Sequence, residues 1–592
     1  MNMKSIKNLF IIGSALLLAS CQQGLLDRAP YDAVASGNMW TNENLADMGV
    51  TGIYEVLRSG NVVGDMYKFE GYGVSGECRD QDYSLLRGNV TTGDGQFSGY
   101  WKINYEGISR ANDAIFNLPN VSMKTAGKKE RLIAEAKFLR AFFYYRLNIM
   151  FKGVPLYLEP TDLDGFTKGR DSEEQVWNQI ISDLTDAINT ESLPDKYEAG
   201  SGDYGRITKG AAYALRGQAY MWMKNWAKAE SDFRSVGQCG YGIFNDGTDE
   251  AYKHLFKEAN EQCEEMIFSM QCIGLSGYGN EFSFRYGSRS TFGSCWNSFL
   301  VNSDFVESYE NADGSKFDWD DYIPGYNSMS PTARAVYFLR DGMTDSEKSK
   351  MASNNADMSK YLPEGNEERI KKVYDNRDPR LKMTVITPYS EYLGALSANS
   401  VTYTLRWPFR SDNEPSKDLK TDTNNRYYYL FRKFVAEGAT EIPNRSYSPI
   451  DIPIIRYADV VLSLAECLNE QGQQDKINEA IQLVNKVRER AGVALLNSNE
   501  YTQVNGQEDL RNRIRNERRW EFAGEGINFF DEMRWKTWHE TKFFEGAGLK
   551  QIWGQPQYTH TWAGDFIYSW AIPKSEIQVN GNLTPNDGWP KD

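Results

Sequence analysis

The sequence predicts a mostly α-helical protein in which paired helices form a scaffold around a loop-rich, mixed region. Apolar residues recur every three or four positions over about 100–236 and again over about 451–540, as one buried helix face requires. Between about 240 and 450 this periodicity fades, and glycine, serine, asparagine, aspartate and aromatic residues dominate. No low-complexity linker separates these parts, so we expect residues 21–592 to form one domain.

The N-terminus carries an export signal of the lipoprotein type. Lys4 and Lys7 precede an apolar run at 9–19, which is shorter than the roughly 20 residues that span a bilayer as a helix. The run ends in Leu-Ala-Ser before Cys21, which resembles a bacterial lipobox. We therefore predict that residues 1–20 are a cleaved signal peptide and that the Cys21 sulfur carries a lipid anchor. The alternative is an ordinary signal peptide in which Cys21 occurs by chance.

The composition argues against several classes of function. The 592 residues carry a formal net charge of −15 and the pI is near 5.0. Nucleic-acid binding needs a basic surface, so nucleic acid is excluded as a partner, and polyanions are disfavoured as bulk partners. The six cysteines besides Cys21 form no C-x-x-C pattern, so neither a metal site nor a redox pair is indicated and we assign no disulfide.

The first predicted helices lie between Tyr105 and Ala187. Apolar residues follow helical spacing in three segments, and the third segment begins at Ser172 with Gln175 three residues later. This combination is a capping box, in which both side chains accept hydrogen bonds from amides at the helix start. It places the start of the third helix just after Ser172.

Residues 213–236 carry the pattern of large and small residues that tetratricopeptide repeats use. In such repeats two antiparallel helices interlock, and small residues lie where the helices touch. Gly217 and Ala229 would occupy these contact positions. The other matching residues are Tyr213, Tyr220, Trp226 and Phe233. A weaker second match over 464–487 indicates another helix pair, and generic helical hairpins are the alternative interpretation.

The loop-rich residues 240–450 are where we expect most of a binding site. Long ordered loops on a rigid scaffold often carry binding residues. A pyranose packs its apolar C–H face on Trp or Tyr rings while its hydroxyls form hydrogen bonds, and aromatic residues make up 13% of this chain. The candidate rings are Tyr67, Tyr72, Trp101, Tyr278, Tyr286, Trp296, Trp319 and Tyr322. For each ring, packing in the core is the competing interpretation.

No catalytic signature is present. The sequence contains neither G-x-S-x-G nor H-E-x-x-H, and its three histidines are far apart, so we predict no catalytic residue, no metal and no cofactor. A glycosidase needs only two carboxylates, and a hydrolase with such a pair therefore stays open. The cluster of Asp318, Asp320 and Asp321 would bind Ca²⁺ only with help from carbonyl groups, and a solvated turn is the alternative.

Short blocks along nearly the whole chain form a further pattern. The densest is Asn-Glu-Arg-Arg-Trp-Glu-Phe-Ala-Gly-Glu-Gly at 516–526, and others are Arg-Asp-Pro-Arg-Leu at 377–381 and Arg-Tyr-Ala-Asp-Val at 456–460. The remaining blocks lie at 26–30, 101–112, 135–142, 153–156, 432–434, 465–466, 485–488, 530–531 and 572–577. In this order they resemble the SusD/RagB family of Bacteroidota outer-membrane lipoproteins. Their alternating charges, as at Glu517 and Arg518, predict paired, partly buried networks.

The resemblance implies a SusD-like fold, with tetratricopeptide-like helix pairs on one side and a loop-rich, glycan-binding region on the other. It also implies a lipid anchor in the outer membrane, an outward orientation and a SusC-like TonB-dependent transporter as partner. Arg79 and Trp101 lie in a stretch that corresponds to an aromatic and basic part of the family's site. Tyr278, Tyr286 and Trp296 lie in a stretch that corresponds to the other part.

Three function classes follow from the sequence. The leading hypothesis is binding of oligosaccharides without catalysis and their delivery to the transporter. The alternatives are a carbohydrate-active hydrolase with an unrecognised carboxylate pair, and a surface lipoprotein that binds peptides or host proteins.

Overall fold

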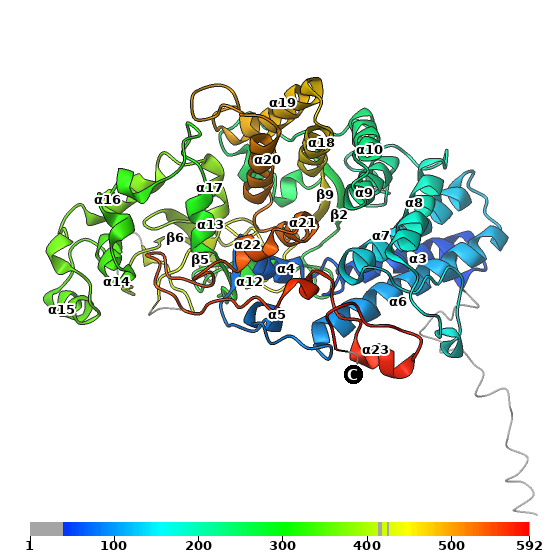
Figure 1. The fold of residues 1–592 in the computed structure, drawn as a ribbon, viewed down its shortest axis with the longest axis horizontal. Coiled ribbons are helices and arrows are strands. Elements are labelled where there is room, and N and C mark those ends of the chain that lie inside the picture. The colour runs from blue at the N-terminus through cyan, green and yellow to red at the C-terminus, as the bar shows by residue number, and fades with distance from the viewer. Residues whose placement is uncertain (1–38, 413–416, 423–425, 591–592) are drawn as a thin grey trace, which may run out of the picture.

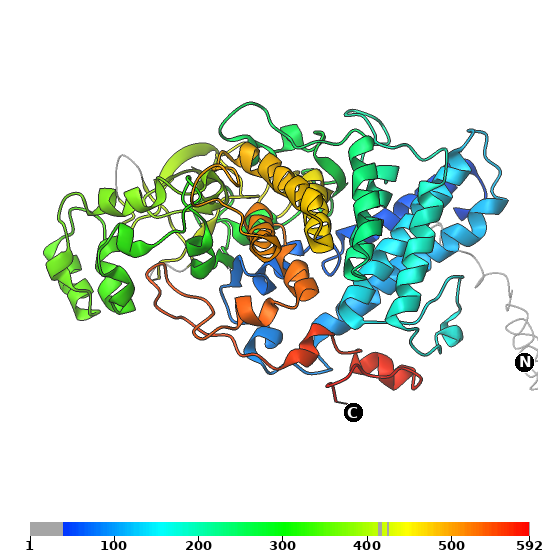
Figure 2. The same cartoon turned by 45° about the horizontal axis from the view of Figure 1, so that its top comes forward.

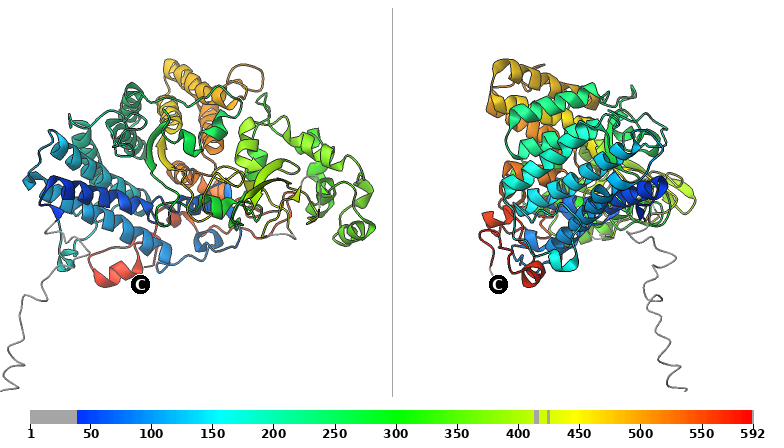
Figure 3. Two further views of the ribbon diagram at one scale, coloured as in Figure 1. Left: turned by 180° about the vertical axis from the view of Figure 1, so that it is seen from behind. Right: turned by 90° about the vertical axis from the view of Figure 1, so that its right-hand side faces the viewer.

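A computed structural model describes residues 39–412, 417–422 and 426–590. Most of the regular structure is helical, and the described strands are short, so the predicted fold class is confirmed. The predicted signal peptide and Cys21 lie outside the described residues. The molecule is elongated, with most of the long helices at one end and the loop-rich region at the other, as Figures 1 and 3 show.

The N-terminal half forms the first part of the helical scaffold. Its helices are α3 (Glu43–Tyr54), α4 (Met66–Tyr72), α5 (Ser84–Arg87), α6 (Gly95–Asn117), α7 (Lys128–Phe151), α8 (Glu173–Ile188), α9 (Lys209–Trp222) and α10 (Trp226–Gln238). From α6 to α10 each helix packs on the next one along the chain, and α3 packs on α6 and α7. Figure 2 shows the resulting array of adjacent long helices.

The second part of the scaffold comes from the C-terminal half. Its helices are α18 (Tyr457–Gln471), α19 (Gln474–Ala491), α20 (Gln507–Glu521), α21 (Asn528–Trp535), α22 (Trp538–Lys542) and α23 (Lys574–Val579). Helix α18 pairs with α19 and also packs on α10, so that the two helical parts form one continuous scaffold. The chain then returns along the lower edge in Figure 1 and brings α23 against α6.

Two details of helix formation were predictable. The capping box is present: the Ser172 hydroxyl accepts from the Gln175 amide, and the Gln175 side chain accepts from the Ser172 amide. A Cβ atom added to Gly217 would lie 2.6 Å from the Phe233 ring, so only glycine lets α9 and α10 approach this closely. The predicted helix pair over 213–236 is therefore confirmed.

The region between the two helical parts contains short elements joined by long loops. Its helices are α11 (Ala251–His254), α12 (Phe282–Tyr286), α13 (Ser303–Ser308), α14 (Pro331–Arg334), α15 (Asp345–Ser353), α16 (Asn366–Lys371) and α17 (Pro379–Thr384). Short strands pair mostly across long sequence separations, which local periodicity does not reveal. The six cysteines of the described part of the chain are free thiols.

The strands tie the loop-rich region to the scaffold. They are β1 (Gly76–Cys78), β2 (Met266–Met270), β3 (Phe299–Val301), β4 (Val385–Ile386), β5 (Glu391–Leu396), β6 (Asn399–Thr404), β7 (Lys417–Asp418), β8 (Leu430–Phe431) and β9 (Ile452–Arg456). The pairs β1–β3, β2–β9, β4–β8 and β5–β6 are antiparallel, and β7 runs parallel to β6. Because β9 leads directly into α18, the β2–β9 pair fixes the loops that follow β2 relative to the helices.

A fully buried network of charges lies where these parts meet. The Arg456 guanidinium donates to Glu265 and Glu521 at 2.7 Å each and to Glu525 at 2.8 Å. Arg380 binds Glu517 at 2.6 Å and Glu521 at 3.1 Å. Burial alone would raise the pKa of Glu521, but the surrounding arginines outweigh it and hold this pKa well below its usual range. The predicted charge pairing in 516–526 is therefore confirmed.

Removing one carboxylate of this network should destabilise the fold. Replacing Glu521 by Gln leaves buried guanidinium groups short of a counter-charge, which typically costs about 3–5 kcal/mol of unfolding free energy. Because the pKa of folded Glu521 is depressed, the wild-type advantage is full above about pH 4.5 and shrinks as the pH falls. Urea unfolding at pH 7 and pH 3.5 measures both effects.

Glu500→Gln is the matched control, because this substitution removes the same charge from an exposed position. An unfolding free energy for Glu521→Gln equal to that of the control would contradict a stabilising role for the network.

Candidate functional site

Most of the rings proposed from the sequence lie in the core. The buried candidates, with their exposed fractions, are Tyr67 (2%), Tyr72 (4%), Trp101 (5%), Tyr286 (0%) and Trp319 (3%). Each is covered by other rings. Trp101 packs on Phe151 with the ring centres 5.1 Å apart, and Tyr286 stacks on Phe431 at 4.3 Å. In this structure these faces are therefore covered, as the competing interpretation of core packing expects.

The other buried candidates are also held by hydrogen bonds. The Trp319 indole donates to Glu307 at 2.8 Å, and the Tyr67 hydroxyl donates to Asp65 at 2.7 Å. Tyr322 is partly exposed and lies beside Phe317, with its hydroxyl 3.4 Å from Asn311. Among the described residues, its ring contact and hydrogen bond are therefore with Phe317 and Asn311 and not with Tyr278, Trp296 or Arg79.

Two of the candidate rings are well exposed. Tyr278 is 54% exposed and Trp296 is 40% exposed. Both lie in loops between β2 and β3, on either side of the short helix α12. We call the surface formed by residues 271–297 and 443–448, together with Arg58, Arg79 and Asp422, the aromatic loop surface.

Arg79 is brought directly to Trp296. Its Nη1 donates to the Trp296 carbonyl at 2.6 Å and to Asp422 at 2.9 Å, and its Nη2 donates to Asp80 at 2.8 Å. Arg289 also binds Asp422. Arg79 and Trp296, which the family resemblance assigned to different parts of one site, are thus in contact although 217 positions separate them.

The segment 443–448 packs against both aromatic loops. Gly274 lies against Pro443 and Gly279 against Tyr447, and Asn280 forms a β-bridge with Ser448. Between Pro443 and Tyr447, the Arg445 guanidinium lies 4.7 Å from the Phe284 ring centre. This segment therefore joins the Tyr278 loop and the Trp296 loop into one surface.

Sequence reasoning did not single out Phe284, Arg58 or Arg445. Phe284 packs on Trp296 with ring centres 4.8 Å apart, and Arg58 lies over the Tyr278 ring at 5.6 Å. Phe284 lies in the predicted loop-rich region with an aromatic side chain, so composition could have included it. Nothing local marks Arg58 or Arg445, because their partners lie far away in the sequence.

Two carboxyl groups, those of Asp451 and Glu261, lie where the chain leaves β2 and enters the aromatic loop surface. Asp451 accepts hydrogen bonds from the Cys272 amide and the Gln271 side chain, both at 2.6 Å, and Glu261 accepts from the Asp451 amide at 3.2 Å. Burial, followed by the charge of Glu261, raises the pKa of Asp451 to about 8. Burial raises the pKa of Glu261 to about 7. Asp451 thus acts as an anchor for the loop that follows β2.

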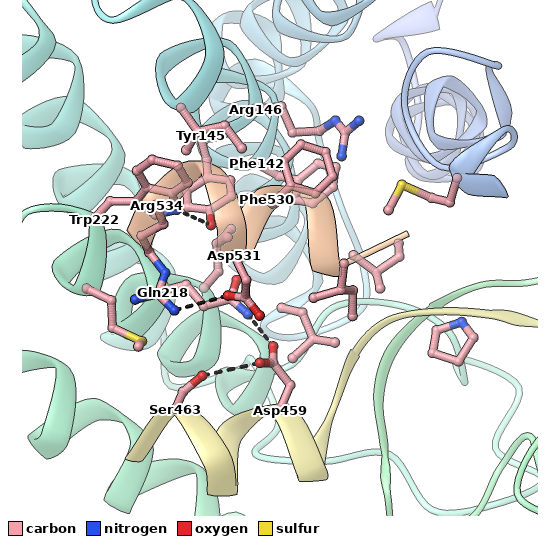
Figure 4. A pocket seen from close by; sticks show the side chains of 18 of the residues that line it. Phe142, Tyr145, Arg146, Gln218, Trp222, Asp459, Ser463, Phe530, Asp531 and Arg534 are labelled. Atoms are coloured by element: carbon pink, nitrogen blue, oxygen red, sulfur yellow. Dashed lines mark hydrogen bonds and ion pairs between the residues drawn. The ribbon is translucent and has the colours of Figure 1, made fainter. Parts of the chain in front are cut away.

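A separate pocket of about 100 Å³ lies between the two helical parts of the scaffold. Figure 4 shows the rings of Phe142, Tyr145, Trp222 and Phe530 above a polar floor. On that floor Asp459 accepts from Gln218 at 2.6 Å and from Ser463 at 3.2 Å. These polar groups satisfy one another, so the pocket offers mainly apolar surface. A saccharide needs hydrogen-bonding partners, and Asp459, Gln218 and Ser463 on this floor are already engaged with one another.

Within residues 39–412, 417–422 and 426–590, no group of three His, Cys, Asp or Glu side chains is placed to hold a metal ion. Over the same described ranges, no helix combines the length and the apolar character that crossing a bilayer requires. Asp318 and Asp320 accept hydrogen bonds from the Asn327 side chain and amide respectively, which closes a turn.

Comparison with known proteins decides the family. The profile described as the SusD family matches residues 264–589, more than half of the chain. The chain belongs to the SusD family. A second profile, described as starch-binding and associating with the outer membrane, matches residues 25–221. The family resemblance expected from the sequence blocks is confirmed.

Individual SusD-family relatives agree over nearly the full length. SusD-like protein P38 of Formosa agariphila is 23% identical over 550 residues, which cover 90% of this chain and 92% of that relative. The crystal structure of a SusD-like protein from Bacteroides fragilis matches with a TM-score of 0.72 at 22% identity, covering 95% of this chain and 100% of that one. A SusD-like carbohydrate-binding protein from the same species matches with a TM-score of 0.69 at 24% identity, covering 92% and 99%. These structures show that the chain has the SusD fold.

The carboxyl anchor of this SusD-family protein should make its stability depend on pH. Asp451 is protonated in the folded state up to about pH 8, whereas in the unfolded chain it ionises near pH 3.8. The folded state therefore loses its advantage as the pH rises between these values. Asp451→Asn keeps a neutral side chain to which the Gln271 amide can adapt, so its melting temperature should fall less than that of the wild type between pH 5 and pH 8.5.

Asp249→Asn, which changes an exposed carboxylate, is the control and should follow the wild type. If the melting temperatures of Asp451→Asn and the wild type fall by the same amount across this pH range, the raised pKa of Asp451 is contradicted.

Proposed function

We propose that this protein is a glycan-binding lipoprotein of the outer membrane that captures oligosaccharides on the aromatic loop surface and passes them to a SusC-like TonB-dependent transporter. The observation that carries the proposal is the exposure of Tyr278 and Trp296 on loops that long-range contacts hold in place. The Bacteroides fragilis relative described as carbohydrate-binding supports the same ligand class.

The geometry suits reversible sugar binding. Each exposed ring presents an apolar face on which the C–H face of a pyranose can stack. Arginine groups that lie over one side of these rings supply hydrogen-bond donors for hydroxyl groups, and Asp422 supplies acceptors. Because Arg58 and Arg79 bind main-chain carbonyls of the two loops, the rings are held in place before a ligand arrives.

We further propose that the protein breaks no bond in its ligand. The carboxylates that contact the arginines of this surface, Asp80, Asp422 and Glu281, are each engaged in an ion pair. Glycoside hydrolysis needs one carboxyl group as a proton donor and a second as a nucleophile or base, both directed at the sugar. The ion pairs on this surface favour binding instead.

The rings should account for much of the affinity. Trp296→Ala and Tyr278→Ala should each weaken binding to an oligosaccharide identified from a glycan array by about 1–3 kcal/mol, which is the range of aromatic hot spots. Isothermal titration measures the affinity, and the melting temperature should stay close to that of the wild type because both rings are largely exposed.

Tyr501→Ala is the matched control, since Tyr501 is 50% exposed and lies in the loop between α19 and α20. Unchanged affinity in both ring variants would remove the aromatic loop surface as the site. Release of new reducing ends by the purified protein would favour a hydrolase, and binding of peptides but no glycan would favour a peptide-binding protein.

The membrane association proposed here depends on Cys21. The profile described as associating with the outer membrane supports this location. Cys21→Ser should move the protein from the membrane fraction to the soluble fraction, because the serine hydroxyl cannot form the thioether that carries the lipid. Cys239→Ser, which alters a thiol of the folded part, is the control and should stay with the membrane. Co-purification of a TonB-dependent barrel with the tagged wild type in mild detergent checks the proposed partner.

A further inference from the structure

Two arginines of the aromatic loop surface stack on its rings without a carboxylate partner. The Arg58 guanidinium carbon lies 5.6 Å from the Tyr278 ring centre. The Arg445 guanidinium carbon lies 4.7 Å from the ring centre of Phe284 and 6.0 Å from that of Trp296. Both arginines are partly exposed. Within the residues that the structure describes, neither one forms an ion pair.

The neighbouring arginines behave differently. Arg79 pairs with Asp80 and Asp422, Arg289 pairs with Asp422, and Arg285 pairs with Glu281. Three arginines thus pair with Asp80, Asp422 and Glu281, whereas Arg58 and Arg445 pair with none of these carboxylates. The excess positive charge is concentrated at Arg58 and Arg445, beside the two rings that remain exposed.

Main-chain contacts hold both guanidinium groups in place. Arg58 Nη1 donates to the Gln271 carbonyl at 2.6 Å. Arg445 Nη1 donates to the carbonyls of Gly293 at 2.8 Å and Ser294 at 2.6 Å. Arg58 Nε also donates to the Gly277 carbonyl at 3.4 Å, so these bonds orient each guanidinium against a ring while Nη2 has no hydrogen-bond partner among the described residues. An oriented guanidinium loses little freedom when an anion binds its remaining donors.

We infer that the aromatic loop surface selects anionic saccharides, with carboxylate or sulfate groups bound by Arg58 and Arg445 while pyranose faces stack on Tyr278 and Trp296. This inference rests on the proposed glycan-binding function and specifies its ligand class. Carboxylate and sulfate both present oxygen pairs that match the guanidinium fork, so the two sources share one recognition chemistry.

The acidic character of the whole chain does not prevent this selection. The net charge of −15 is spread over 592 residues. At physiological ionic strength the Debye length is about 8 Å, so distant carboxylates contribute little to the potential at the rings. The charged groups that lie over the two exposed rings are Arg58 and Arg445. Binding of an anionic sugar should accordingly weaken as the salt concentration rises, whereas binding of a neutral sugar should not.

The test uses pairs of oligosaccharides that differ only in charge. One pair is a uronic-acid oligosaccharide and its carboxyl-reduced form, and the other is a sulfated oligosaccharide and its desulfated form. We expect the wild type to bind at least one anionic member about tenfold or more tightly than its neutral partner, as charge-assisted hydrogen bonds provide. Titrations with Arg58→Gln and Arg445→Gln should lower the affinity for the anionic member more than the affinity for the neutral member, so that most of this preference is lost.

Arg234→Gln is the control, because it removes one exposed arginine from α10 in the scaffold. Equal affinity for charged and neutral members, or an unchanged preference in both arginine variants, would overturn the inference while the proposed glycan-binding function stands. Failure of every oligosaccharide on a broad array, neutral and charged, would overturn the proposed function itself. Uronate-only or sulfate-only binding identifies which anion the arginines take and supports the inference.

Discussion

The buried charge network around Glu521 and Arg456 is the constraint on which the rest of the structure depends. Arg456 ends β9, Glu521 ends α20 and Glu265 immediately precedes β2, so their ion pairs join three parts of the chain that are far apart in sequence. Charges without access to water are stable only when each is matched by a partner of opposite sign. The network therefore admits one arrangement of these segments, and the loops that follow β2 inherit their position from it.

The scaffold was predictable because its signals are local. A capping box needs only Ser172 and Gln175, and the close approach of two helices needs only the small residue Gly217 opposite Phe233. The short sequence blocks at 377–381, 456–460 and 516–526 also predicted that charges pair, since each contains acidic and basic residues within a few positions. These signals were sufficient for the fold class and the family. The short strands were missed, because most pair with distant partners.

The site was predictable only in part, because exposure depends on the whole fold. Trp101 and Trp296 are chemically identical candidates in the sequence, yet α7 covers the first with Phe151 while loop geometry leaves the second at the surface. Arg79 contacts Trp296, whereas Trp101, which the family resemblance placed in the same stretch as Arg79, is buried. No feature of the sequence near Arg445 predicts its position over Phe284, since that position depends on how residues 443–448 pack on the two aromatic loops.

The recognition loops are fastened to the scaffold largely through backbone atoms. The Arg58 guanidinium donates to the carbonyls of Gln271 and Gly277, and the Asp451 carboxyl accepts from the Cys272 amide. Asn280 and Ser448 form two main-chain hydrogen bonds with each other. These hydrogen bonds use backbone atoms of the loop, so they do not depend on which side chains the loop carries. The outward side chains of residues 273–279 can therefore be replaced without loss of the contacts that support the loop, so the surface chemistry of this loop can change while the scaffold stays the same.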